Sequence, residues 1–441
     1  MTKINIAGLN VDAITRPEFI AQISGRLATD KKTFVITPYS EFLYAALRDR
    51  EVMNLLNSAD VAIPDGIGLI WAERFLGLPF SFSNYYLKII QALWQIVYSG
   101  AAILLRPNWV YKALPQKLVG ADMVWEISKL AEQEQKSVYL LGGFGNTAEI
   151  VAKKLQTLNH RLKIAGWSNK NPNDPSTVED INSAKADLLF VAYGPIRQEQ
   201  WIEKNLAALN VKLAMGVGGT FDYIAGIKKQ PPAFVRNIGL EWLYRLITQP
   251  YRFRRIVNAT WGLIFEVLRY KVFMSLPYRN NVVSIIMNNE GHFLIFQRNP
   301  KDRSLYEIGE TDRTKFVNYW QFTQGGIDRG EDVLAATVRE VKEETGIQSI
   351  THIYTSKHRH RYLYRTSKKL FDNHFKFTGQ EQTIVYFRFT GDNSEIVLDD
   401  EELVNYQWVD RKDLRSIIHP ERWPIVEIIE KDLPVIIEKN A

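Results

Sequence analysis

The 441-residue chain predicts two domains in tandem, a parallel α/β sheet covered by helices and then a smaller α+β domain. The length is about three times that of a usual domain of ~150 residues. Short β-rich runs alternate with helical stretches between Thr33 and Leu268. After Met274, Ser275-Leu276-Pro277-Tyr278 ends a basic, apolar helical stretch, and a strand-like run follows. We therefore expect domains at 1–274 and 275–441.

The first domain is predicted from five short apolar runs separated by helical stretches. Strands separated by helices usually form a parallel sheet with helices on its faces. Most of the runs are followed by Gly, Pro, Asp or Asn, and ligands of open α/β sheets bind beyond the carboxyl ends of the strands. The expected strands are Phe34–Ile36, Val61–Ile63, Ser137–Leu141, Leu188–Val191 and Leu213–Val217.

The second domain combines short strands with one amphipathic helix, predicted from about Val333 to Thr345. A mixture of this kind indicates an α+β arrangement, with the helix packed on a sheet. The expected strands are Val282–Met287, Phe293–Gln297, Thr383–Phe389 and Tyr406–Val409.

The composition excludes several classes of protein. Hydrophobic residues at 46% and charged residues at 24% are typical of globular domains and not of disordered chains. The chain has no cysteine, which excludes disulfide scaffolds, zinc-thiolate sites, iron–sulfur clusters and thiol nucleophiles. The first residues, 1–5, show no apolar segment of a secretory signal, so we expect a cytoplasmic protein.

Positive charge is concentrated in one segment. The chain has a formal net charge of +6, but residues 228–279 hold ten basic and two acidic residues, which gives +8 for that segment alone. Its basic tail, about 240–274, interleaves arginines with aromatic residues. Such a surface suits anionic phospholipid headgroups, and RNA binding is the competing interpretation.

A long uncharged stretch stands apart from the alternating pattern. Ile89 to Leu105 contains 17 residues without a charge, whereas a membrane-spanning helix needs about 20 apolar residues. Gln91, Gln95, Ser99 and Gly100 interrupt the stretch. We therefore favour a buried or membrane-surface helix over a true span.

A carboxylate-rich helix after a glycine loop gives the most specific chemical prediction. On a helix, Glu340 and Glu344 lie at i and i+4 with Glu343 beside them, and this crowding of charge is unfavourable without a cation. Mg²⁺ prefers such oxygen ligands and often bridges to phosphates. Arg339 can pair with Glu331 and hold the loop against the helix.

The spacing of these residues matches the Nudix box without a departure, and the resemblance covers about residues 276–420. It implies an α/β/α sandwich and a hydrolase dependent on Mg²⁺ or Mn²⁺, with water attacking a phosphoanhydride. It also implies metal ligation by Glu340, Glu343, Glu344 and Glu402, catalytic help from Glu343, Glu344 or Glu402, and phosphate contact by Arg279. The residues of the box are Gly325, Glu331, Arg339, Glu340, Glu343, Glu344 and Gly346.

The flanks of the box resemble the RNA pyrophosphohydrolase and dinucleoside-polyphosphate hydrolase branch of this family. Trp320-Gln321-Phe322-Thr323-Gln324 precedes the box, and Phe377-Thr378-Gly379-Gln380-Glu381-Gln382 follows it. Thr323 stands where that branch usually has proline. The expected substrate of this domain is a nucleotide or an RNA 5′ end.

In the first half each motif is ambiguous alone, but together and in order they resemble the bacterial WecG/TagA/CpsF-type N-acetylmannosaminyltransferases. Asp65 ends an apolar strand in an Asp-Gly turn, which is usually only a turn. The resemblance covers about residues 3–260. The matching stretches are 59–66, 119–122, 139–143, 194–202, 216–222 and 239–245.

This resemblance implies a Rossmann-like glycosyltransferase that needs no metal cofactor. Asp65 would be the general base, and Thr37, Lys117, Gln198 and Asp222 would line the pocket of the UDP-sugar donor. The basic tail would meet the membrane and a polyprenyl-diphosphate-linked acceptor. Arg252, Arg254 and Arg255 would neutralise the leaving UDP or the acceptor diphosphate.

The sequence allows three interpretations of the function. The first is a bifunctional enzyme that transfers an N-acetylmannosamine-like sugar in cell-envelope glycan synthesis and hydrolyses a nucleoside-diphosphate-linked substrate. It would be peripheral on the inner face of the membrane, and a homo-oligomer is an open possibility. The alternative is a Nudix enzyme with a degenerate membrane or RNA tether, suggested by family departures at Tyr39, Lys117 and Gln230. A nucleotide-sensing Nudix domain is a third interpretation, which complete metal ligation disfavours.

Overall fold

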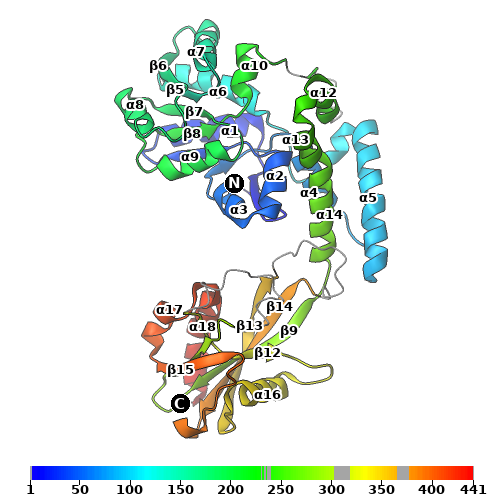
Figure 1. Cartoon of the computed structure of the whole chain (residues 1–441), viewed down its shortest axis with the longest axis vertical. Helices are drawn as coiled ribbons and strands as arrows, with labels where there is room; N and C mark the ends of the chain where they lie inside the picture. Colours follow the sequence, from blue (N-terminus) through cyan, green and yellow to red (C-terminus); the bar gives the residue numbers. More distant parts are fainter. Residues whose placement is uncertain are drawn as a thin grey trace. The chain divides into compact units, whose positions relative to one another are not determined.

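The computed structural model describes residues 2–229, 231, 232, 235, 240–301, 318–364 and 377–440. The chain divides into two compact units, Met1–Val272 and Phe273–Ala441, each of which is described by itself (Figure 1). The expected boundary after Met274 lies two residues beyond this division.

The first unit is built on a six-stranded sheet in the order β4-β3-β8-β7-β5-β6. All of its neighbouring strands pair in parallel, as the alternating pattern predicted. Edge strand β6 was not predicted, because its side chains are only partly buried and form no apolar run. The strands are β3 Thr33–Ile36, β4 Val61–Ala62, β5 Ser137–Gly142, β6 Lys163–Ser168, β7 Leu188–Ala192 and β8 Leu213–Gly216.

Helices cover both faces of this sheet, so each strand is buried on two sides. Phe34 of β3 belongs to one apolar cluster and its neighbour Val35 to another on the opposite face. The hairpin of β1 (Lys3–Ile6) and β2 (Leu9–Asp12) joins β4 through buried Asp12, whose Oδ2 accepts from the N–H of Ala62 at 2.8 Å. The helices are α1 Arg16–Leu27, α2 Ser40–Arg48, α3 Arg50–Asn57, α4 Ile67–Leu76, α6 Gly120–Gln133, α7 Thr147–Leu158, α8 Thr177–Ser183, α9 Arg197–Asn205 and α10 Thr220–Ala225.

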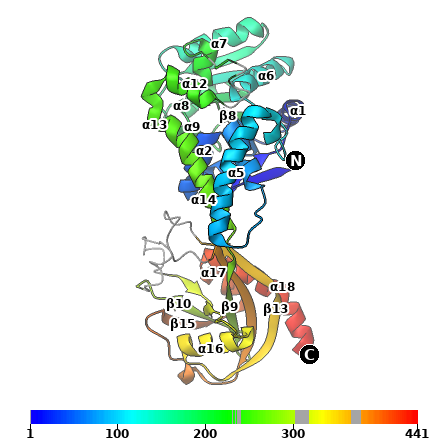
Figure 2. The same cartoon turned by 90° about the vertical axis from the view of Figure 1, so that its right-hand side faces the viewer.

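The uncharged stretch forms one long helix, α5 Tyr85–Leu105, followed by the short turn η1 Pro107–Val110. Among the described residues, α5 is the one helix that is long and apolar enough to cross a membrane, and only 17% of its most apolar window is buried. Of the two forms expected from the sequence, a buried helix and a membrane-surface helix, this low burial is inconsistent with the first. Figures 1 and 2 show α5 running beside α14 (Leu263–Met274).

The basic tail folds as a chain of helical segments fixed to α2 and α4. Gly262 lies so close to Tyr44 that a Cβ there would be 2.7 Å from the tyrosine ring. Buried Glu266 pairs with Arg48 at 3.3 Å, and the Lys271 ammonium donates to the carbonyl of Leu78 at 2.8 Å. The segments before α14 are α12 Glu241–Thr248, η2 Pro250–Arg252, α13 Phe253–Val257 and the π-helical turn η3 Asn258–Gly262.

The second unit contains a mixed seven-stranded sheet in the order β11-β10-β9-β14-β13, with β12 paired to β9 and β15 to β10. Strands β9 and β14 pair in parallel and the other pairs are antiparallel. The strands are β9 Tyr278–Met287, β10 Phe293–Arg298, β11 Trp320–Gln321, β12 Gln324–Gly326, β13 Ile350–Leu363, β14 Gly379–Phe389 and β15 Leu403–Val409.

Helices pack on the two faces of this sheet in separate apolar clusters, which confirms the α/β/α prediction. Helix α16 spans Val333–Thr345, the range predicted from the sequence, and packs through Val341. Helices α17 (Leu414–Ile417) and α18 (Trp423–Asn440) cover the other face. Strand β13 and helix α18 were not predicted, because β13 carries alternating basic side chains and α18 contains Pro434.

Candidate active sites

A cavity of about 950 Å³ lies at the carboxyl ends of the first sheet's strands. Of the residues proposed from the sequence, Thr37, Asp65, Gln198, Asp222 and Arg255 line it. Lys117 and Arg254 are not among the lining residues, and the side chain of Arg252 lies outside the described part of the chain. Gln230 is likewise outside the described residues.

Asp65 follows β4 and is held by the loop that begins α6. Its Oδ2 accepts a hydrogen bond from the N–H of Gly120 at 3.0 Å. Desolvation, with a smaller contribution from the Glu241 charge, raises the pKa of Asp65 to about 6, although the Gly120 bond and Lys117 oppose the shift. A carboxylate with this pKa is a competent base near neutral pH.

Lys117 acts on Asp65 through its charge and belongs to a group of ion-paired side chains. Its ammonium pairs with Glu241 at 3.2 Å, and Glu241 also approaches Arg245 at 3.6 Å. The Lys117 side chain is only 12% exposed. Lys117 therefore acts on the site electrostatically and through Glu241 of α12, rather than as part of the cavity wall.

Gln198 is fixed at the start of α9 by a buried carboxylate that the sequence analysis missed. Its Oε1 accepts from the N–H of Gly218 at 2.9 Å, and its Nε2 donates to Glu199 at 2.8 Å. Glu199 also accepts from the N–H of Ile196 at 2.7 Å, and burial raises its pKa to about 7. A glutamate at the third position of a helix is the one sequence signal that could have identified it.

Thr37 and Asp222 lie at other points of the same cavity. Thr37, at the end of β3, is 7% exposed and would lie 3.3 Å from a Cβ at Gly120. Asp222, in α10, forms an ion pair with Lys228, which also lines the cavity. Both residues can therefore meet a ligand that reaches Asp65.

Arg255 reaches the cavity from α13 and is held there by α2. Its Nε donates to Glu41 at 2.7 Å, and its guanidinium donates to the hydroxyl of Tyr39 at 3.1 Å. Tyr39 is one of the departures from the family pattern, and here it orients a cation. Arg254, by contrast, is exposed.

The far wall of the cavity is apolar and comes from two elements distant in sequence. Helix α5 contributes one set of side chains, and the segment from α13 to α14 contributes the other. The cavity therefore joins a polar end at the strand termini to an apolar end between helices. The apolar lining residues are Ile96, Val97, Ile103, Leu104, Ile256, Trp261, Leu263 and Ile264.

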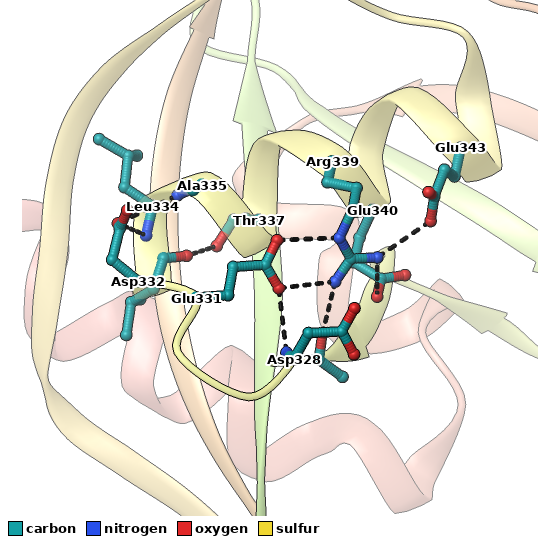
Figure 3. A network of polar contacts seen from close by, with 11 residues as sticks. Asp328, Glu331, Asp332, Leu334, Ala335, Thr337, Arg339, Glu340 and Glu343 are labelled. Atoms are coloured by element: carbon teal, nitrogen blue, oxygen red, sulfur yellow. Dashed lines mark hydrogen bonds and ion pairs between the residues drawn. The ribbon is translucent and has the colours of Figure 1, made fainter.

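In the second unit, Arg339 is the hub of the carboxylate helix (Figure 3). Its guanidinium donates to both carboxylate oxygens of Glu331, at 2.9 and 3.0 Å, and to the carbonyl of Gly326 at 2.9 Å. It also donates to Glu340 at 2.8 Å and to Glu343 at 3.0 Å. Arg339 thus holds the glycine loop against the helix. This confirms the predicted pairing of Arg339 with Glu331.

Glu344 is the buried carboxylate of the group. It is 7% exposed, and its Oε2 makes no hydrogen bond to any residue that the structure describes. Burial raises the pKa of Glu344 well above its usual value, and the nearby charges of Glu402 and Glu340 raise it further. The structure thus places the predicted residues Glu340, Glu344 and Glu402 within electrostatic reach of one another.

The carboxylates of Glu340, Glu343, Glu344 and Glu402 are not arranged around a common metal position in this structure. Among the described residues, no group of three His, Asp or Glu side chains is arranged to hold a metal, and Glu340 and Glu343 turn toward Arg339. The unpartnered Glu344 oxygen nevertheless belongs to a carboxylate that feels the negative charges of Glu402 and Glu340. A divalent cation would relieve that charge, so the residues fit one.

Two glycines bring the loop close to functional side chains. A Cβ at Gly325 would overlap the Glu340 carboxylate, and a Cβ at Gly326 would overlap the guanidinium of Arg279. Arg279 therefore lies against the loop of the box. Gly346 ends α16 with a φ of 72°, a conformation that favours glycine.

Thr323, the other departure from the family pattern, has a structural role. It is 1% exposed, and its hydroxyl is hydrogen-bonded to that of Ser284 on β9. The threonine thus replaces a proline with a buried link between the loop before the box and the sheet.

Comparisons with known proteins agree with both families that the sequence resembles. Residues 4–97 and 81–276 match the glycosyl transferase WecG/TagA/CpsF family, and residues 277–429 match the NUDIX domain. The N-acetylglucosaminyldiphosphoundecaprenol N-acetyl-beta-D-mannosaminyltransferase of Bacillus spizizenii is 27% identical over 57% of this chain and 85% of its own length. The enzyme of the same name from Staphylococcus aureus is 24% identical over 58% of this chain and 88% of its own.

Among solved structures, the E. coli dihydroneopterin triphosphate pyrophosphohydrolase matches 35% of this chain and 96% of its own, with 20% identity and a TM-score of 0.26. The assignment of the second unit depends on the family match and the box, not on this likeness. The chain belongs to the WecG/TagA/CpsF glycosyltransferase family and carries a Nudix hydrolase domain after its transferase domain.

Proposed function

We propose that the first unit transfers an N-acetylmannosamine-like sugar from a UDP-sugar to a polyprenyl-diphosphate-linked acceptor in cell-envelope glycan synthesis. The observation that carries this proposal is the form of the cavity, with Asp65 at its polar end and an apolar wall on α5 and α14. An acceptor with a sugar diphosphate head and a hydrocarbon tail likewise has one polar and one apolar part, which match the two ends of the cavity. The relatives from Bacillus spizizenii and Staphylococcus aureus are named for transfer to such an acceptor, N-acetylglucosaminyldiphosphoundecaprenol.

In this mechanism Asp65 removes the proton from the acceptor hydroxyl as its oxygen attacks the anomeric carbon of the donor. The new glycosidic bond forms while the bond to the UDP phosphate breaks, which inverts the anomeric centre. Thr37, Gln198 and Asp222 bind the donor, and Lys117 steadies the site through Glu241. Arg255, helped by Arg252 and Arg254, neutralises the departing UDP or the acceptor diphosphate.

We also propose that the second unit hydrolyses a phosphoanhydride in a nucleoside-diphosphate-linked substrate. Glu340, Glu343, Glu344 and Glu402 would hold Mg²⁺ or Mn²⁺, which when bound neutralises phosphate charge and lowers the pKa of water. Glu344 or Glu402 accepts the proton of the attacking water, and Arg279 holds a phosphate oxygen.

The alternative of a degenerate first half has less support. Tyr39, which departs from the family pattern, orients Arg255 toward the cavity, and Lys117 retains an ion pair beside Asp65. These departures therefore keep charged groups at the site. Failure of the purified chain to transfer sugar, together with intact hydrolysis of RNA 5′ ends or dinucleoside polyphosphates, would favour the alternative.

The direct test of both proposals is a paired assay on the purified full chain. Sugar transfer is measured from UDP-N-acetylmannosamine to a soluble short-chain lipid-diphosphate acceptor. Phosphate release is measured with Mg²⁺ on UDP-sugars, dinucleoside polyphosphates and 5′-triphosphate RNA. Transfer abolished by Asp65→Asn and release abolished by Glu344→Gln are expected; activity unchanged in both variants would refute the assigned sites.

We further propose that the protein works at the inner face of the membrane, where its acceptor resides. The basic tail supports this location, since Arg254 is exposed and interleaved with exposed Tyr251 and Phe253. A triple variant with alanine at Arg252, Arg254 and Arg255 should bind vesicles containing phosphatidylglycerol more weakly. Equal binding by the variant and the wild type would remove the tail from this proposal.

A further inference from the structure

Helix α5 buries polar side chains and exposes apolar ones, which is the reverse of a helix on the surface of a water-soluble domain. Its polar side chains face the protein: Gln95 donates to the carbonyl of Pro79 at 2.9 Å, and Ser99 accepts from the Trp71 indole at 2.9 Å. Gln95 is 6% exposed and Ser99 is fully buried. A soluble helix normally buries its apolar stripe and exposes its polar one.

The outward face of α5 is apolar along its whole length. Tyr86, Ile90 and Trp94, spaced four residues apart, are 69%, 62% and 63% exposed. Val97 and Leu105 continue the surface with 72% and 81% exposed. Contiguous apolar surface of this kind marks an interaction site, and polar residues turned inward are typical of helices whose surroundings are hydrocarbon.

The position of α5 favours lying on a membrane over crossing one. The middle of the helix is pinned to α4 by the Ser99 and Trp71 contact, while Tyr98 packs on Trp109 of η1, which follows directly. The segment before α5 is fixed as well, since Lys271 of α14 binds the carbonyl of Leu78. Both ends of α5 therefore return to the same unit.

The charges around α5 are those of a helix at a lipid interface. Lys88 and Arg106 bound its uncharged stretch at the two ends, where long cationic side chains can reach phosphate headgroups. The neighbouring tail adds exposed Phe253, Trp261 and Phe265 next to its arginines. A cationic and aromatic border of this kind suits the anionic surface of a bilayer.

The active-site cavity opens onto the same surface. Val97 and Leu104 of α5 and Trp261 of η3 line the cavity, and these three side chains are also 72%, 51% and 59% exposed. The boundary between α5 and η3 is thus both a cavity wall and part of the apolar surface. A hydrocarbon chain in the membrane could enter there without passing through water.

We propose that α5 lies in the headgroup region of an anionic bilayer with its Tyr86, Ile90 and Trp94 face in the hydrocarbon. The acceptor's polyprenyl chain then reaches the transferase cavity directly from the lipid phase, between α5 and η3. The first statement stands on α5 alone, and the second rests on the proposed transferase function. The bilayer is the occupant of this surface, and a second copy of the chain is the competing one.

Vesicle binding tests the docking of α5 directly. The double variant Ile90→Glu/Trp94→Glu changes exposed residues that do not line the cavity, and Leu158→Glu, at a 68% exposed position on α7, is the matched control. We expect the double variant to bind phosphatidylglycerol and phosphatidylcholine vesicles about tenfold more weakly or worse, since binding follows buried apolar area. The control should bind like the wild type. Equal binding by all three proteins would overturn the proposal.

A fluorescent label gives a second readout that does not depend on loss of binding. The chain has no native cysteine, so Ile90→Cys and Leu158→Cys can each carry one environment-sensitive dye. With vesicles, the dye at residue 90 should show a blue shift and the dye at residue 158 should not. A blue shift that instead accompanies dimerisation without lipid, detected by light scattering, would assign the surface to a second copy.

Transfer assays separate failure of this inference from failure of the transferase proposal. The Ile90→Glu/Trp94→Glu protein should use a soluble short-chain acceptor like the wild type but lose most transfer to a long-chain acceptor embedded in vesicles. Equal use of both acceptors by variant and wild type would refute entry from the lipid phase. No transfer by the wild type to either acceptor would refute the transferase proposal and leave the vesicle result to decide the docking of α5.

Discussion

The N–H of Gly120 donates a hydrogen bond to Oδ2 of Asp65 at 3.0 Å, which joins two motifs 55 residues apart. A second bond, from the N–H of Leu118 to the carbonyl of Pro64 at 2.8 Å, holds the same two loops together. The stretch at 119–122 therefore orients the proposed base. Asp65 stays ionisable near neutral pH because this bond and Lys117 partly offset its desolvation.

Replacing Asp65 with asparagine should abolish transfer and leave hydrolysis intact. The amide keeps the shape of the side chain but cannot take the acceptor proton, so kcat should fall by about 10²- to 10⁴-fold. Initial rates of sugar transfer measure the effect. Asp30→Asn, at an exposed position, is the control and should behave like the wild type. A variant that retains more than a tenth of the wild-type rate would exclude Asp65 as the base.

The transfer reaction should depend on pH through Asp65. Because its pKa is raised to about 6, the carboxylate is protonated below that pH and cannot act as the base. We expect kcat, measured with saturating UDP-sugar so that changes in KM do not contribute, to rise between pH 5 and 7 with the slope of one proton and a midpoint of about 6. A pH profile of kcat measures this, and a flat profile over that range would contradict the assignment.

Glu199 should act as a positioning residue for the donor. Glutamine at this position can accept from the N–H of Ile196, but its amide cannot accept from Gln198, so Gln198 loses its orientation. In Glu199→Gln we expect the KM for the UDP-sugar to rise about tenfold, the loss of roughly one hydrogen bond, with a smaller change in kcat.

The pH dependence of KM distinguishes positioning from a general structural effect. Burial raises the pKa of Glu199 to about 7, so the wild-type KM should change near that pH while that of the variant should not. A raised pKa also means that ionised Glu199 costs stability above pH 7, a cost the variant lacks. If kcat fell at least as strongly as KM rose, with lower stability at pH 8, the residue would be structural.

Gly325→Ala should disable the hydrolase because its Cβ would overlap the Glu340 carboxylate. The carboxylate or the loop must shift, and we expect about a 100-fold loss of hydrolysis and ~1–3 kcal/mol of destabilisation. Gly291→Ala is the control, since it has a positive φ of 84° but no atom near its Cβ. The control should lose stability only. Normal hydrolysis by Gly325→Ala would show that the Glu340 position is unimportant.

Magnesium should stabilise the wild type more than Glu344→Gln at the same concentration. Burial and the charges of Glu402 and Glu340 raise the pKa of Glu344, so without metal its ionisation costs stability as pH rises above the carboxyl range. A bound cation offsets that cost. The glutamine variant should bind Mg²⁺ at least about tenfold more weakly than the wild type. Thermal unfolding at pH 8 across a magnesium titration measures both effects. An equal Mg²⁺ shift in both proteins would place the metal elsewhere.

The fold could be predicted where burial alone determines the pattern. Strands such as β7 and β8 are buried on both faces and read as apolar runs, and α16 is fixed by its N-cap Asp332 and by Gly346. Edge strand β6 and the long strand β13 have mixed side chains, because one face or one end of each is exposed. Local sequence carries little signal for such strands.

Site contacts that are local in sequence could be predicted, whereas contacts between distant segments could not. The box is local, since Glu331, Arg339 and Glu340 lie within ten residues and meet through a loop and one helix. Contacts between distant segments, such as Arg255 with Tyr39 and Glu199 with the loop of Gly216, needed the folded chain. The exposed apolar face of α5 could not be predicted either, because the sequence shows an apolar helix but not which of its sides is buried.

The most direct test of the account is one experiment on four purified full-length proteins: the wild type, Asp65→Asn, Glu344→Gln and the double variant. Each is assayed for sugar transfer to a soluble lipid-diphosphate acceptor and for Mg²⁺-dependent phosphate release. The account predicts that Asp65→Asn loses transfer alone, Glu344→Gln loses release alone, and the double variant loses both. Loss of both activities from either single substitution, or retention of both in the double variant, would contradict it.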